Sequence, residues 1–206
     1  RVGQHFLDLV TRGDQQGVTH AVADADPLGL HRRGRTTGGI GTATTGLAKH
    51  LASIGHQVTV LYARGYQMSA SQMKHWTAVY REDGIDFVPL AARSVGAVRG
   101  PLAALGFPAP AAVLDYLRAR HYDIVHLNDL EGEGCLAIAS RKCGIAFQNT
   151  AFVTGLHSPT KWIETLNKEP AQHSVSVAMD AAEQFQIRNS DVLWSPEPDS
   201  NRRPRP

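Results

Sequence analysis

The stretch that decides the fold is Thr36-Thr37-Gly38-Gly39-Ile40-Gly41-Thr42-Ala43-Thr44-Thr45-Gly46-Leu47-Ala48-Lys49-His50-Leu51-Ala52-Ser53-Ile54-Gly55-His56-Gln57-Val58-Thr59-Val60-Leu61. It begins with a glycine-rich loop and continues as an amphipathic helix, because Leu47, Leu51 and Ile54 recur at helical spacing on one face. Gly55 stands where a helix C-terminal glycine is expected. Residues 58–62 are β-branched and aromatic, which is typical of a buried strand.

The glycine-rich loop allows two interpretations. Free backbone N–H groups and the helix dipole attract anions, above all phosphate, to such a place. Alternatively, the glycines only form a tight turn that lets helix and sheet pack closely. The loop fits neither common phosphate motif. Thr44 occupies the third glycine of a dinucleotide fingerprint, and Leu47-Ala48 follows Gly46 where a P-loop has lysine and a hydroxyl residue.

Composition excludes several classes of protein. The chain has 206 residues, of which 42% are hydrophobic and 19% are charged, as expected of one ordinary globular domain. A net charge of +2 is too small to indicate nucleic-acid binding. No apolar run approaches the roughly 18 residues of a membrane span, and no signal peptide is recognised. We therefore expect a cytoplasmic protein without a transmembrane segment.

The two cysteines are expected to be free. Cys135 and Cys143 are eight residues apart in a predicted helix, about 12 Å along its axis. That separation is too large for a disulfide, so both are expected as buried thiols in a reducing compartment. Two cysteines without nearby paired ligands do not make a zinc site, and no metal is expected.

Strands and helices alternate along the chain. Strands are predicted at residues 18–24, 58–62, 85–90, 123–127, 146–156 and 191–194, and helices at 69–82, 111–120, 134–142, 160–167 and 174–189. This alternation predicts an α/β fold with a doubly wound parallel sheet over residues 18–194. Residues 1–17 are taken as an N-terminal extension, 91–110 as a loop or lid, and 195–206 as a disordered Pro/Arg-rich tail.

Polar residues follow three of the predicted strands. In open parallel sheets, ligands bind outside the carboxyl ends of the strands. The residues concerned are Gly38, Gly39, Ile40 and Gly41 after the first strand, His126, Asn128 and Asp129 at the fourth, and His157 after the fifth.

Each of these residues also has a structural explanation. His126 can be a core histidine, Asp129 a helix cap and His157 a hydrogen-bonded loop residue. Arg32, Arg33 and Arg35 either reach an anionic ligand or form a solvated loop. Taken together, the clusters after the three strands predict one binding site.

Two segments carry a resemblance to a known family. Tyr122-Asp123-Ile124-Val125-His126-Leu127-Asn128-Asp129-Leu130-Glu131-Gly132 resembles a motif Asp-Val-Val-His-x-His/Asn-Asp-Trp followed by glycine. Gly155-Leu156-His157-Ser158-Pro159-Thr160-Lys161-Trp162 resembles a strand that ends in His-x-Pro-x-x-Trp. With the opening loop, these are similar to the N-terminal, Rossmann-like half of GT-B glycosyltransferases of family 4, the glycogen-synthase-like or group 1 kind. The branch that builds bacterial surface polysaccharides is the most similar.

The resemblance implies a function for each motif. Gly38, Gly39, Ile40 and Gly41 would present N–H groups to the diphosphate of a nucleotide-sugar co-substrate. His157 would face the donor sugar, orienting and stabilising it without acting as a general base. His126, Asn128 and Asp129 would line the acceptor side. Retaining enzymes of this kind need no metal or other cofactor, because helix dipoles and basic groups neutralise the leaving diphosphate.

The sequence also departs from that family. Leu130 replaces the usual tryptophan, and His20 and Asp24 are unusual in the first strand. A second Rossmann-like domain that grips the donor is missing after residue 196, so a truncated protein or a separate donor-domain subunit is expected. Alone, the chain should bind nucleotide-sugars weakly and transfer no sugar. The alternatives are a non-catalytic carbohydrate-binding or regulatory module and an NAD-dependent enzyme. The failed fingerprint and Tyr62-Ala63-Arg64, where an acidic residue is needed, disfavour NAD.

Overall fold

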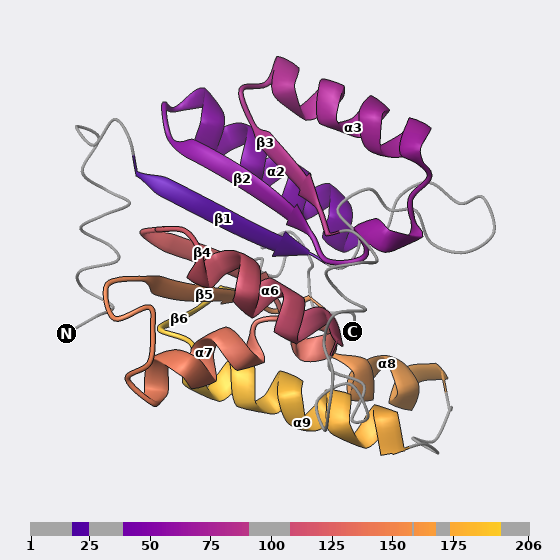
Figure 1. Ribbon diagram of the computed structural model, residues 1–206. Helices are drawn as coiled ribbons and strands as arrows, with labels where there is room; N and C mark the ends of the chain where they lie inside the picture. The colour runs from indigo at the N-terminus through magenta and orange to yellow at the C-terminus, as the bar shows by residue number, and fades with distance from the viewer. Residues whose placement is uncertain (1–17, 25–38, 91–107, 158, 168–173, 195–206) are drawn as a thin grey trace, which may run out of the picture.

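The computed structural model describes residues 18–24, 39–90, 108–157, 159–167 and 174–194. Its centre is a parallel sheet of six strands in the order β3-β2-β1-β4-β5-β6 (Figure 1). The strands are β1 (Thr19–Asp24), β2 (Gln57–Tyr62), β3 (Asp86–Pro89), β4 (Ile124–Asn128), β5 (Ala151–Gly155) and β6 (Val192–Trp194). This order confirms the predicted doubly wound α/β fold.

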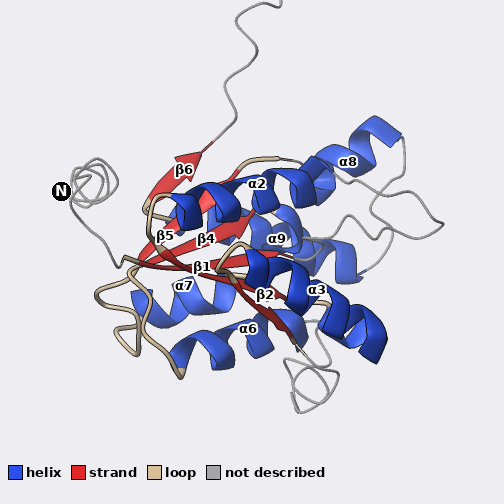
Figure 2. Cartoon of the chain, turned by 90° about the horizontal axis from the view of Figure 1, so that it is seen from above, coloured by secondary structure: helices blue, strands red, loops and turns tan. Residues whose placement is uncertain are grey.

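Helices cover both faces of the sheet (Figures 1 and 2). They are α2 (Gly39–Ser53), α3 (Ala70–Glu82), α6 (Pro108–Arg118), α7 (Cys135–Lys142), α8 (Thr160–Asn167) and α9 (Ser174–Asn189), with single 3-10 turns η1 (Gly65–Gln67) and η2 (Leu130–Gly132). Helices α2 and α3 pack on one face of the sheet, and α6 and α7 pack on the other. Helix α9 packs against α7, α8 and η2.

The apolar strands bury both of their faces, as parallel strands do. On the α2 and α3 side, Val60 and Tyr62 pack with Leu51 and Tyr80. On the α6 and α7 side, the core cluster is formed by residues that include Val125, Leu127, Phe152, Val113 and Ile138. Burial of these side chains fixes the sheet and leaves its carboxyl edge to the loops.

The end of α2 follows the sequence prediction closely. Gly55 has a φ of 93°, a left-handed conformation that favours glycine. Its N–H donates to the Ala52 carbonyl at 3.0 Å, and the His56 N–H donates to the Leu51 carbonyl at 3.1 Å. These two bonds form a Schellman motif, which ends the helix and starts the chain into β2.

Several local predictions are corrected by the structure. Gly39, Ile40 and Gly41 form the first turn of α2 and not a loop before it. Ile54 was expected on the buried helix face, but it follows the last helical residue and is 54% exposed. Strand β5 begins at Ala151, because residues 146–150 form turns and coil.

Both cysteines are free, as predicted, but only Cys135 is buried. Cys143 is exposed because it caps the C-terminus of α7 and no longer lies on the inward face of the helix. The loop or lid predicted at 91–110 is wrong in its last three residues, because α6 begins at Pro108. The rest of that loop, the predicted extension, the tail, Gly38, Ser158 and the three arginines at 32, 33 and 35 lie outside the described residues. Within the described ranges, no helix has the length and apolar character needed to cross a bilayer.

Candidate functional site

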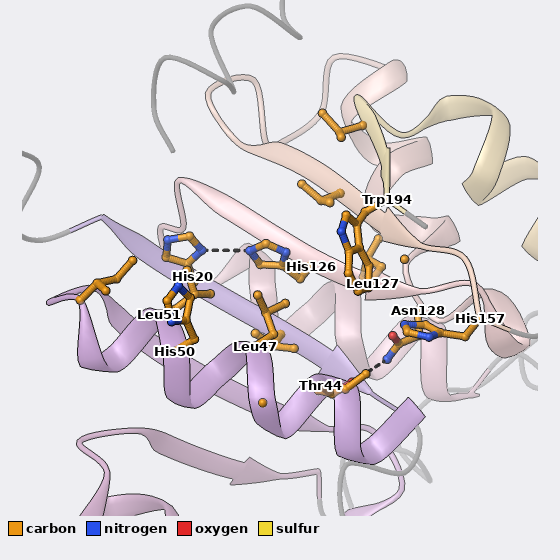
Figure 3. Close-up of a pocket in the computed structure, with 17 residues that line it drawn as sticks. His20, Thr44, Leu47, His50, Leu51, His126, Leu127, Asn128, His157 and Trp194 are labelled. Carbon is orange, nitrogen blue, oxygen red and sulfur yellow. Dashed lines mark hydrogen bonds between the residues drawn. The ribbon is translucent and has the colours of Figure 1, made fainter. Parts of the chain in front are cut away.

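The site lies where the winding of the sheet reverses direction. β1 and β4 are neighbours, and the chain continues from β1 toward β2 but from β4 toward β5. At such a switch point the connections leave in opposite directions and open a crevice at the carboxyl ends of the strands. A pocket of about 570 Å³ runs from this edge along the face of the sheet, between α2 and strands β1, β4, β5 and β6 (Figure 3).

The structure brings three of the predicted site residues to this pocket. His126, Asn128 and His157 all line it, and Thr44 of α2 joins them. The Asn128 side-chain amide donates to the Thr44 hydroxyl at 3.3 Å, which links the end of β4 to α2 (Figure 3). The predicted proximity of the segments after the fourth and fifth strands is therefore present.

Asp129 differs from its neighbours. It is completely buried, and its Oδ2 accepts a hydrogen bond from the His157 backbone N–H at 2.9 Å. Although Asp129 stands at the N-cap of η2, its side chain makes no capping hydrogen bond there. Its carboxylate instead joins the segment after β5 to the segment after β4.

The ring of His157 is half-buried and contacts Trp194 of β6, with ring centroids 5.8 Å apart in an edge arrangement. A Cβ added at Gly155 would lie 3.0 Å from His157 Nε2. The absence of a side chain at Gly155 thus lets the ring fold back over the end of β5. Trp194 was not among the predicted site residues, because only the tertiary fold brings β6 beside His157.

The first turn of α2 faces the carboxyl edge of the sheet. Gly41 is buried, and the following Ala43 and Thr44 line the pocket. The first N–H groups of a helix have no carbonyl partner within the helix and carry a partial positive charge. This turn is suited to an anion even though its glycines lie in the helix and not before it.

Helix α9 supplies two residues that the sequence analysis missed. Glu183 accepts hydrogen bonds from the Glu131 N–H at 2.6 Å, from the Thr160 N–H at 2.9 Å and from the Thr160 hydroxyl. Gln186 donates to the Asn128 carbonyl at 2.7 Å and accepts from the Gly134 N–H at 2.8 Å. Both side chains are fully buried. They hold the segments after β4 and β5 together. The spacing of three residues, which places both side chains on one face of α9, was the sequence signal that could have identified them.

An ion pair supports the same edge from β2. Arg64, which follows β2, pairs with Glu131, whose backbone has a φ of 61°. Burial alone would lower the pKa of Arg64, but its hydrogen bond and charge interaction with Glu131 raise it. A non-glycine residue in the left-handed region is strained and needs such fixation by its surroundings.

Substitution of Glu183 tests whether its hydrogen bonds to Glu131 and Thr160 stabilise the fold. Burial raises the pKa of its carboxyl, against the effect of its three donors. In a Glu183→Gln variant one acceptor oxygen becomes a donor, so at least one N–H or O–H loses its partner. We expect a loss of about 1.5 kcal/mol in the free energy of unfolding, measured with urea. Glu82→Gln, at an exposed position of α3, should stay within about 0.5 kcal/mol of wild type. Equal losses in the free energy of unfolding of the two variants would contradict a stabilising role of the Glu183 hydrogen bonds.

Three histidines form a hydrogen-bonded chain, and two of them, His20 and His126, line the pocket. His20 Nδ1 lies 3.0 Å from His126 Nε2, and His20 Nε2 lies 3.1 Å from His56 Nδ1. Burial lowers the pKa of His20 to about 4, helped by His56 and opposed by Asp123. Burial, together with the charge of His20, lowers the pKa of His126 to about 3. His20 and His126 are therefore neutral at pH 7. No cluster suited to a metal ion occurs in the described part of the chain.

Comparisons with known proteins identify a family and a similar solved structure. A solved structure of the glycotransferase of kitacinnamycin aligns with a TM-score of 0.39 and 16% identity, over 84% of this chain and 38% of that one. The present chain thus spans well under half the length of that protein. A search of curated proteins found no match. The sequence model of the glycosyl transferase 4-like domain family matches residues 38–204 of this chain. The chain therefore belongs to this family.

Proposed function

We propose that this chain is the acceptor-side domain of a retaining glycosyltransferase, which moves a sugar from a nucleotide-sugar to a glycan or another acceptor. One observation carries the proposal. The N-terminus of α2, Asn128 and His157 meet at the carboxyl edge of the sheet, at its switch point. Ligands of open α/β sheets bind at such places. Membership of the glycosyl transferase 4-like family supplies the class of reaction.

Each residue has a role in this proposal. Backbone N–H groups around Gly39, Ile40 and Gly41, preceded by Gly38, bind the donor diphosphate and stabilise its charge as it leaves. His157 faces the donor sugar and orients it. His126 and Asn128 contact the acceptor. Asp129, assigned to the acceptor side from the sequence, is buried and acts on the site through His157, because its carboxylate accepts a hydrogen bond from the His157 backbone N–H.

The diphosphate needs further positive charge. Within the described ranges, no Lys or Arg lines the pocket, and Arg64 near its edge is already paired with Glu131. We therefore propose that a donor-binding domain outside these 206 residues completes the site, as a further part of the protein or as a separate subunit. Alone, the chain is expected to bind nucleotide-sugars only at about millimolar concentration, or about −4 kcal/mol.

A charge placed at the first turn of α2 tests the proposal. Titration of the chain with UDP-glucose, GDP-mannose and ADP-glucose, followed by NMR chemical shifts, should show weak binding of at least one. Gly39→Asp should weaken that binding at least tenfold, because its carboxylate repels the diphosphate.

Ser71→Asp is the matched control, since it adds the same charge to the first turn of α3. It should leave binding unchanged. Binding that survives in Gly39→Asp would contradict the assigned diphosphate site. Binding of a glycan, with no response to any nucleotide-sugar, would favour a non-catalytic carbohydrate-binding module.

A further inference from the structure

We propose that the pocket binds the apolar part of an uncharged acceptor, such as an alkyl chain or an aromatic ring system. The acceptor hydroxyl then lies at the end of the pocket formed by Thr44, Asn128 and His157. The inference rests on the proposed function and adds to it the chemical class of the acceptor.

The walls of the pocket are apolar on both sides. Leu47, Leu51 and Ile54 come from α2 and the turn after it, and Val22, Val153, Val192 and Trp194 come from the sheet. Among the described residues that line the pocket, none is Asp, Glu, Lys or Arg. A volume of about 570 Å³ lies within the roughly 300–1,000 Å³ of small-molecule sites. Such walls favour a ligand without charge, because a charged group would lose its water and gain no partner.

The polar side chains of the pocket are unevenly distributed. Figure 3 shows Thr44, Asn128 and His157 together at one end, and His20, His50 and Leu51 at the other. Both ring nitrogens of His20 are already hydrogen-bonded to other histidines. His20 therefore offers no ring nitrogen to a ligand. A ligand with one polar end is oriented by this arrangement, with its hydroxyl at the carboxyl edge of the sheet.

The border of the pocket exposes apolar surface. Ile54 is 54% exposed and Trp194 is 48% exposed, although both side chains line the pocket. Covering them with an apolar group removes this surface from water, which is favourable in proportion to the area covered. The apolar walls offer no hydrogen-bond donor to the donor diphosphate, which in this proposal binds at the first turn of α2. The donor diphosphate and the apolar part of the acceptor thus bind in chemically different regions of the site.

A series of alkyl glucosides tests the inference. Methyl, hexyl and octyl β-D-glucoside are titrated into the full chain below their micelle concentrations, with binding followed by calorimetry. Each added methylene should tighten binding about fourfold, so octyl should bind about 15-fold tighter than hexyl. The heat-capacity change should become more negative with chain length. Equal affinity for hexyl and octyl glucoside, or no binding of either, would overturn the inference.

Two isoleucines give a matched pair of variants. Ile54→Gln should weaken octyl glucoside binding at least fivefold, because a polar group then stands in the wall. Ile145→Gln should leave binding unchanged, because Ile145 is 70% exposed and does not line the pocket. Leu47→Gln repeats the test on the middle of α2, and circular dichroism verifies the fold of each variant. Equal losses in Ile54→Gln and Ile145→Gln would reveal non-specific detergent binding and overturn the inference.

The same samples separate this inference from the proposed function. UDP-glucose is titrated into wild type and Gly39→Asp in parallel with the glucoside series. A length-dependent glucoside series without Gly39-dependent nucleotide binding leaves the apolar site standing and rejects the donor site. The reverse result rejects the apolar site and leaves the donor site intact.

Discussion

Acidification from pH 6.5 to pH 5 is expected to lower the free energy of unfolding by about 2 to 4 kcal/mol. The cause is the burial of His20 and His126. Burial lowers the pKa of His20 to about 4 and that of His126 to about 3, whereas an unfolded histidine has a pKa near 6.5. The unfolded state therefore binds more protons than the folded state in this range.

The sign and size follow from that difference. The stabilising contribution of the two neutral histidines is fully present above pH 6.5, and it is lost as the pH falls from 6.5 toward the folded-state pKa values of about 4 and 3. Over 1.5 pH units one neutral histidine loses about 2 kcal/mol, at about 1.36 kcal/mol per unit. His20 and His126 both stay neutral in the folded state over this range, so the two together lose at most about 4 kcal/mol.

Urea unfolding at pH 5.0, 5.5, 6.0 and 6.5 measures this slope. The wild type is compared with His126→Leu, in which the slope should fall by about half. His75→Gln, at an exposed position of α3, should keep the wild-type slope. The comparison also removes the contributions of the buried Glu183 and of Asp123, which all three proteins share. A His126→Leu slope equal to wild type would contradict the assignment of the pH dependence to the buried histidines.

The sequence predicted the elements well, because their signals are local. The helical spacing of α2, the glycine that ends it and the apolar runs of β2 and β4 lie within short windows of sequence. The doubly wound parallel sheet followed from the alternation of these elements, whereas the order of its strands comes from the structure. Cys143 and Ile54 were placed wrongly because each stands at the end of a helix, where one residue decides between the inner face and solvent.

The contacts within the site could be predicted only in part. His126 and Asn128 lie in the second half of β4 and His157 follows β5, so the topology alone brings them toward one edge. The partner of His20 is 106 residues away in sequence, and the partners of Glu183 belong to segments 23 and 52 residues earlier. Such pairs depend on side-chain packing across the fold, and no local pattern in the sequence specifies them. The same holds for the contact of Trp194 with His157.

Replacing Gly132 by alanine is expected to lower the free energy of unfolding by about 2 to 5 kcal/mol. Gly132 follows Glu131 in η2 and has a φ of 61°. A left-handed conformation costs alanine about 1–2 kcal/mol. A Cβ there would also lie 2.7 Å from the carbonyl carbon of Ala182 and 2.8 Å from the Glu183 backbone nitrogen. These are backbone atoms of α9 and cannot rotate away, so overpacking adds about 1–3 kcal/mol.

Gly144→Ala separates the two contributions to this loss. Gly144 has a φ of 72°, but an added Cβ would meet nothing within 4 Å, so this variant should lose only the conformational part, about 1–2 kcal/mol. Urea unfolding of both variants measures the difference. Gly132→Ala should in addition push α9 away from η2 and break the hydrogen bond from the Glu131 N–H to Glu183. Its binding of octyl glucoside should therefore fall, while Gly144→Ala binds as wild type does. Equal stability losses in the two variants would mean that α9 does not press against the loop after β4.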